Sequence, residues 1–108
     1  MNKTNLLLSH HEVARILDVN KDRLRGWLNE GFITPSYKSS GTGIANLYSV
    51  DSLYKLLAFK DLVDSGISRA IAAEICMGTY NMSGIVNIIV DWEKIHRIID
   101  ERLDKWNN

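Results

Sequence analysis

Apolar residues recur at helical spacing twice near the start of the chain. The two sets, each at positions i, i+3 and i+4, are Val13, Ile16 and Leu17, then Leu24, Trp27 and Leu28. Residues with this spacing lie on one face of a helix. Residues 18–20 separate the sets, about the length of the turn in a helix-turn-helix. The pattern predicts two short helices that share a buried seam, with Trp27 in it.

Polar residues at the ends of these helices support the same prediction. Ser9 can cap the first helix, and Glu12 three residues later completes a capping box. Asn20 can cap the second helix. Gly31 can end it, and Pro35 prevents the helix from resuming.

The second helix carries polar and basic side chains away from the seam or on its flank: Lys21, Arg23, Arg25 and Asn29. A short basic helix held by a partner helix fits the major groove of DNA. We therefore predict that these four residues contact DNA. His10 and His11 open the first helix, where solvent exposure and phosphate contact are both interpretations of their role.

Further elements follow along the chain. Small, polar and glycine residues at the centre of residues 36–48 predict a hairpin tip. Caps and apolar faces predict helices over residues 50–64 and 69–77. The β-branched run Ile85–Val90 predicts a strand, and a single apolar stripe predicts a last helix over Trp92–Trp106. Leu6 to Leu8 form a short strand or simply cover the core, and the second interpretation is favoured.

Several motifs in order resemble the MerR-type winged helix-turn-helix domains. The residues that carry this resemblance are Leu24-Arg25, Trp27, Glu30-Gly31-Phe32, Pro35, Leu47-Tyr48-Ser49, Leu53, Leu56, Leu62 and Ser65-Gly66-Ile67-Ser68. The similarity covers roughly residues 8 to 76. It implies a mainly α fold with a small β wing, to which the pattern adds a C-terminal strand and helix.

The resemblance also implies partners and a wider DNA interface. Double-stranded DNA is the expected ligand, and the wing would add Tyr37, Lys38 and Tyr48 to the contacts. The chain departs from the family pattern at Asn46, where an arginine is usual. It departs again at Gly26, where a tyrosine is usual, and this glycine would let the helix approach DNA more closely.

Composition places limits on these interpretations. The chain has 108 residues and a formal net charge of zero, which suits one domain. Residues 1–60 hold eight basic and five acidic residues, a balance of +3, and residues 61–108 hold five and eight, a balance of −3. The positive half is the one with the helix-turn-helix. No apolar run approaches the roughly 20 residues of a membrane span, and one cysteine fits a reducing cytoplasm.

No catalytic or metal-binding motif stands out, so we predict neither an enzyme nor a cofactor, and no small-molecule effector is evident. We divide the chain into a DNA-binding part, residues 1–78, and an extension, residues 79–108. The surplus apolar surface of residues 85–106 predicts a homodimer, with folding back onto the same chain as the alternative. A sequence-specific transcription regulator is the favoured function. An excisionase-like architectural factor and a winged-helix protein-interaction module are the alternatives.

Overall fold

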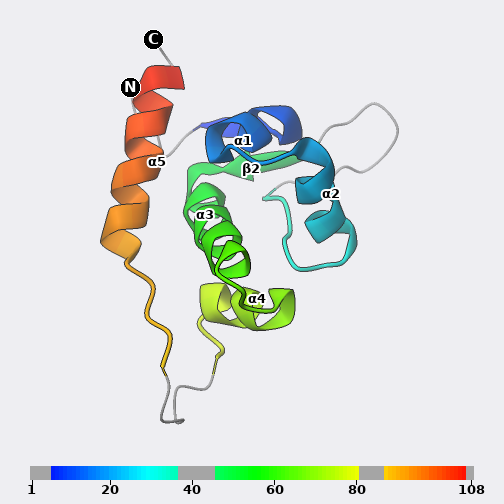
Figure 1. Ribbon diagram of the computed structural model, residues 1–108. Coiled ribbons are helices and arrows are strands. Elements are labelled where there is room, and N and C mark those ends of the chain that lie inside the picture. The colour runs from blue at the N-terminus through cyan, green and yellow to red at the C-terminus, as the bar shows by residue number, and fades with distance from the viewer. Residues whose placement is uncertain (1–5, 37–45, 81–86, 107–108) are drawn as a thin grey trace.

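The computed structural model describes residues 6–36, 46–80 and 87–106, and within them the chain is mainly helical with a small two-stranded sheet. The elements in order are β1 (Leu7–Ser9), α1 (His10–Leu17), α2 (Lys21–Asn29), β2 (Leu47–Ser49), α3 (Val50–Asp64), α4 (Arg69–Met77) and α5 (Trp92–Trp106). Figure 1 shows α3 at the centre, with the other helices arranged around it. The predicted winged helix-turn-helix is confirmed.

The helix-turn-helix forms through the predicted caps. The Ser9 hydroxyl accepts a hydrogen bond from the Glu12 amide at 3.2 Å, and the Glu12 carboxylate accepts one from the Ser9 amide at 3.0 Å. The Asn20 side chain accepts from the Asp22 amide at 2.7 Å. Between the helices, Asp18 ends α1 in the left-handed region at φ 56°, which aspartate tolerates better than most residues. Local polar groups thus set both the ends of the helices and the turn.

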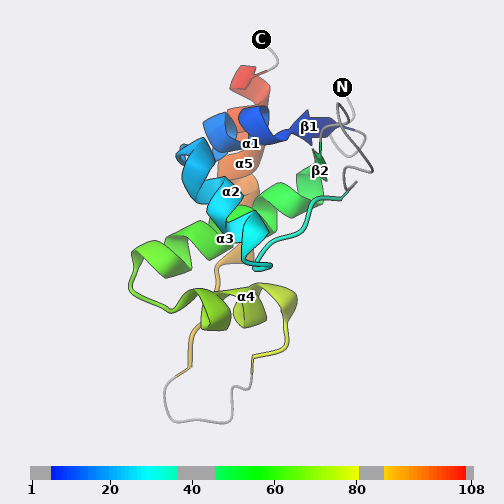
Figure 2. The same ribbon diagram turned by 90° about the vertical axis from the view of Figure 1, so that its right-hand side faces the viewer.

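The small sheet pairs two segments that lie far apart in sequence. β1 and β2 are antiparallel, with Leu8 opposite Tyr48, and each leads directly into a helix (Figure 2). The residues before α1 therefore form a strand, and the favoured interpretation that these leucines simply cover the core is wrong. Leu8 does enter the core, whereas Leu7 is exposed. The hairpin tip, residues 37–45, lies outside the described residues.

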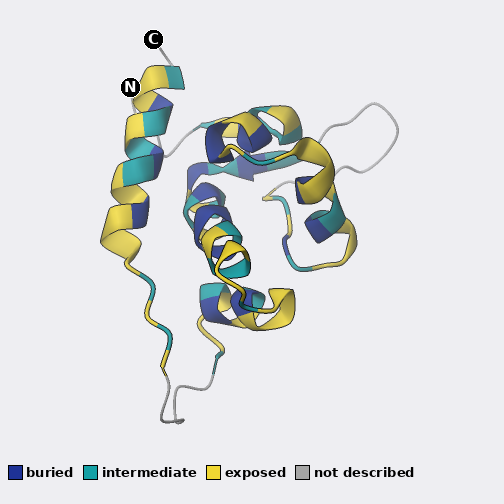
Figure 3. Ribbon diagram, in the orientation of Figure 1, coloured by how far each residue is buried: buried dark blue, intermediate teal, exposed yellow. Residues whose placement is uncertain are grey.

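The seam of the helix-turn-helix continues into a single core. Trp27 is buried, as predicted, and its ring meets the ring of Phe59 on α3 edge-on, with centroids 4.9 Å apart. Figure 3 shows buried positions along α3, and these belong to the same cluster as Trp27 of α2 and Ile99 of α5. α3 is therefore the element against which the helix-turn-helix is oriented.

The last helix folds back onto its own chain. Ile95, Ile99 and Leu103 are buried in the same core as the helix-turn-helix. α5 runs beside α1 and α3 and antiparallel to α3 (Figure 1). The alternative of folding back is thus what the chain does.

The predicted strand at residues 85–90 is wrong for residues 87–90, which form no strand, and residues 85 and 86 lie outside the described part. Ile89 is 90% exposed. The preference of β-branched residues for strands depends on packing against a neighbouring strand. Residues 87–90 pair with no strand among the described residues.

Candidate DNA interface

One face of α2 presents a stripe of polar side chains to solvent. Lys21, Arg25 and Asn29 follow one another at intervals of four residues and are all exposed. Residues at this interval lie one above another on a helix. Leu24 and Trp27 fill the opposite face and are buried. Packing of that face against the core therefore points the polar stripe outward, and we call these three residues the α2 stripe.

Arg23 has different surroundings from the α2 stripe. Its guanidinium donates to the Asp64 carboxylate at the end of α3, at 2.5 Å, and lies over the ring of Trp27, 4.8 Å from the centroid. The hydrogen bond from Arg23, with a second from Lys60, holds the pKa of Asp64 below its usual range. Arg23 therefore joins α2 to α3, and DNA would have to share this guanidinium with Asp64.

Tyr48 cannot make the DNA contact that the resemblance implied. Its side chain is fully buried, with 0% exposed. Burial raises the pKa of its phenol, and the charge of Arg25 opposes that rise. A phosphate could reach this hydroxyl only after the core opened. We therefore remove Tyr48 from the interface.

Tyr48 instead belongs to a chain of hydrogen bonds that joins three elements. His10, the first residue of α1, places Nδ1 at 3.3 Å from the Tyr48 hydroxyl and Nε2 at 3.1 Å from the carbonyl oxygen of Lys21. A carbonyl only accepts, so Nε2 carries the hydrogen, and in the neutral ring Nδ1 accepts from the Tyr48 hydroxyl. His10 thus connects the wing strand to the first residue of α2, a role the sequence did not reveal.

The base of the wing is held by serine hydroxyls. Ser36 accepts a hydrogen bond from the Ser49 amide at 2.9 Å and lies 2.9 Å from the Ser52 hydroxyl. The loop therefore starts beside the first turn of α3. Tyr37 and Lys38, the predicted contacts in the loop, lie outside the described residues.

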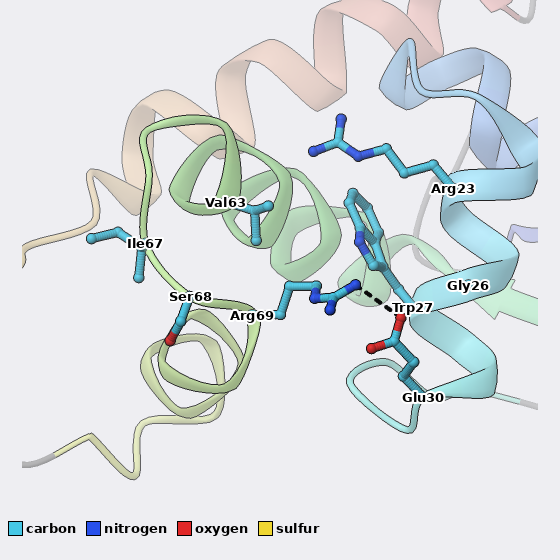
Figure 4. Close-up of a pocket in the computed structure, with 8 residues that line it drawn as sticks. All are labelled: Arg23, Gly26, Trp27, Glu30, Val63, Ile67, Ser68 and Arg69. Atoms are coloured by element: carbon cyan, nitrogen blue, oxygen red, sulfur yellow. Dashed lines mark hydrogen bonds and ion pairs between the residues drawn. The ribbon is translucent and has the colours of Figure 1, made fainter.

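An open cleft lies beside α2, between this helix and the turn from α3 to α4. Its volume is about 490 Å³, and Figure 4 shows Arg23 and Arg69 reaching into it from opposite sides. Arg69 donates to the Glu30 carboxylate at 2.9 Å and lies over the ring of Phe32. We call this the α2–α4 cleft.

Sequence reasoning missed Arg69. It occupies the first position of α4, where the helix dipole favours negative charge. A positive charge at the start of a helix is unfavourable, so the sequence could have indicated that Arg69 pairs with an acidic residue elsewhere. Glu30, at the end of α2, is that partner.

The surroundings of Cys76 do not favour a reactive or metal-binding thiol. Cys76 is half-buried, its thiol lies 3.5 Å from the carbonyl oxygen of Lys55, and burial raises its pKa to about 11. A protonated thiol is a poor nucleophile and metal ligand. The described residues contain no group of three potential metal-binding side chains, and no described helix is long and apolar enough to cross a membrane.

Comparisons with known proteins agree with this arrangement. A family model described as MerR HTH family regulatory protein matches residues 8–78. A crystal structure of a transcriptional regulator of the MerR family from Bacillus cereus matches with a TM-score of 0.58 and 20% sequence identity, over 94% of this chain and 68% of that one. No curated protein matches the sequence.

Proposed function

Because this chain belongs to the MerR HTH family of regulatory proteins, we propose that it binds double-stranded DNA sequence-specifically through α2 and regulates transcription. The family supports a DNA-binding regulator rather than an enzyme. The observation that carries the sequence-specific part is the α2 stripe, a row of exposed polar side chains on a helix whose other face is fixed in the core.

The three side chains of the stripe suit different parts of DNA. A guanidinium such as that of Arg25 can donate two hydrogen bonds to guanine, and an amide such as that of Asn29 can pair with adenine. Lys21, at the start of α2, suits a phosphate. An α-helix with its side chains is about 10–12 Å across, and the major groove, about 12 Å wide, admits it.

Removing charge from the stripe tests this proposal. We expect Lys21→Ala/Arg25→Ala to weaken binding to random-sequence duplex DNA. The salt slope should fall by about two, because each basic side chain that binds a phosphate contributes about one to it. If Arg25 reads a base, Arg25→Ala should instead lose about 1–3 kcal/mol only on the preferred sequence. Fluorescence anisotropy across a salt series measures both effects.

A matched control is available on α5. Lys94→Ala/Arg97→Ala removes two exposed charges from that helix and should leave binding nearly unchanged. Equal losses in both double variants would show binding through net charge alone and contradict the assignment to α2. A folded wild type that binds no duplex at low salt would favour the protein-interaction module.

We also propose a homodimer, which suits two α2 helices about one DNA turn apart, roughly 34 Å. Less apolar surface is available for such a dimer than the sequence indicated, because Ile95, Ile99 and Leu103 are buried in the core of their own chain. Ile89, at 90% exposed, and Trp92, at 36%, remain available to a second copy. Sedimentation decides the matter, and a mass near 12.3 kDa would contradict the dimer.

A further inference from the structure

A hollow lies between α3, the second half of α4 and the segment that leads from α2 toward the wing. Its volume is about 190 Å³, and it shares no lining residue with the α2–α4 cleft. Most of the side chains that line it are apolar: Phe32, Ile33, Leu56, Phe59, Ala73 and Met77. In another protein, a cavity of about 150 Å³ with similar walls binds benzene. This space, which we call the α3–α4 hollow, therefore has room for one aromatic ring.

The walls of the α3–α4 hollow suit such a ring. The rings of Phe32 and Phe59 have centroids 6.2 Å apart and are tilted by 30°, and aromatic rings attract a further ring in offset or edge-on arrangements. Met77 lines the hollow yet is 67% exposed, so it lies at the mouth. A methionine thioether adapts its shape and packs well against aromatic rings. Ala73 is the smallest of the lining side chains and leaves the space open.

One positive charge stands at the edge of the α3–α4 hollow. Lys55 lines it and is exposed, and its ammonium pairs with no carboxylate among the described residues, not even that of Asp51 one turn earlier on α3. Its charge acts inside the hollow, because it opposes the rise that burial causes in the pKa of Cys76, another lining residue. Binding pockets typically combine apolar walls with a few polar groups that orient the ligand. Here that group is a cation, which attracts an anion.

We propose that the α3–α4 hollow binds a small aromatic carboxylate, with its ring against Phe32 and Phe59 and its carboxylate on the ammonium of Lys55. This inference goes beyond the proposed function and does not depend on DNA. The ring of Phe59 also meets Trp27 of α2. A ligand held against Phe59 therefore supports the packing that orients α2.

Phenylacetate and its neutral counterpart phenylacetamide test the inference, because they differ in charge but hardly in shape. Wild type should bind phenylacetate with a Kd of about 1 mM, as expected for a ligand of about ten heavy atoms. Phenylacetamide should bind about fivefold more weakly, since it lacks the ion pair. Lys55→Met keeps the apolar stem without the charge, so it should lose about fivefold on phenylacetate and nothing on phenylacetamide. Titrations followed by the NMR signals of the backbone amides measure these affinities.

Cys76 gives a second, independent readout, because it is the only cysteine of the chain. A ring in the hollow should shield its thiol. Alkylation by iodoacetamide should therefore slow about tenfold at a phenylacetate concentration ten times the Kd. Ala73→Leu, which fills the hollow, should abolish binding. Lys94→Met removes an exposed charge from α5 instead, and this control should bind both compounds as wild type does.

The outcomes decide the inference without reference to DNA. Saturable shifts of amides around the hollow, weakened by loss of either charge, support it. Absence of such shifts at about ten times the expected Kd would overturn it, and so would equal affinity of wild type for the two compounds. Lys55 is exposed, so Lys55→Met should fold even if Ala73→Leu does not. A chain that binds phenylacetate but no duplex would overturn the proposed function and leave this inference standing.

Discussion

At the scale of single residues, the position of an arginine around α2 decides whether it is available to DNA or makes contacts within the fold. Arg23 and Arg25 are two positions apart, which is a rotation of about 200°. Arg25 faces solvent in the α2 stripe, whereas Arg23 pairs with Asp64 on α3. His10 and Tyr48 likewise lie near the proposed interface but bond to each other. They set the position of α2 relative to the wing.

Tyr48→Phe distinguishes a structural hydroxyl from a DNA contact. Removal of the hydrogen bond to His10 should lower the free energy of unfolding by about 0.5–1.5 kcal/mol. Binding to duplex DNA should stay within about twofold of wild type at a temperature where the variant is folded. Urea denaturation and anisotropy measure the two quantities. A variant with wild-type stability and weak DNA binding would restore Tyr48 to the interface.

At the scale of elements, polar and aromatic side chains hold α5 against the helix-turn-helix domain. Arg102 donates to the carbonyl oxygen of Ile16 near the end of α1 at 2.9 Å, where helix carbonyls lack intrahelical partners. Arg15 lies over the ring of Trp106. On α3, the ring of Tyr54 stacks on His96 with centroids 3.7 Å apart. An isolated helix of this length is marginal in water, so these interactions and the buried stripe stabilise it.

The packing of α3 against α5 should make stability fall at alkaline pH. Burial, together with the hydrogen bond that Tyr54 donates to Asp100 at 2.9 Å, raises the pKa of the phenol from 10.0 to about 12. The folded chain keeps this proton where the unfolded chain loses it. The stabilisation is therefore complete below pH 10 and is lost as the pH rises toward 12.

Tyr54→Phe should remove this part of the alkaline decline. Lysines and other tyrosines also titrate in that range, so the comparison is between the slopes of variant and wild type in urea denaturation at several pH values. Asp100→Asn, which keeps an acceptor without the charge, should reduce the slope only in part. Identical slopes in wild type and Tyr54→Phe would show that the pKa of Tyr54 does not differ between the folded and unfolded chain.

At the scale of the whole molecule, α5 completes the same core that orients α2. Ile99 and Leu103 are fully buried beside residues of α1 and α3. The buried residues of α5 therefore belong to the same core as the helix that carries the α2 stripe. A substitution that disrupts the packing of α5 should therefore weaken DNA binding by lowering the stability of the whole chain.

Ile99→Asp tests this placement. A carboxylate in the core loses hydration without gaining a partner, so the variant should be destabilised by more than about 3 kcal/mol. Circular dichroism during urea denaturation measures the change, and Glu101→Gln, at an exposed position of the same helix, serves as the control. A folded Ile99→Asp variant that differs only in its sedimenting mass would place Ile99 at an interface between copies instead.

The sequence by itself determined the local features of this protein. The caps at Ser9 and Asn20, the two-helix seam and the burial of Trp27 followed from it, because each depends on residues within a few positions of one another. The resemblance carried by motifs spread over residues 8 to 76 also located the family correctly. The same patterns predicted that Lys21, Arg23, Arg25 and Asn29 lie outside the seam, but they did not distinguish Arg23, which pairs with Asp64, from the α2 stripe.

Only the tertiary structure decided how distant segments meet. The pairing of β1 with β2 and the bond from His10 to Tyr48 join residues about forty positions apart. The ion pairs of Arg23 and Arg69, at similar separations, leave no periodic signal in the chain. An apolar stripe such as that of α5 shows that a helix must pack, but not against what. In this structure the apolar stripe of α5 packs against α1 and α3 of the same chain, because it can be buried there without a second molecule.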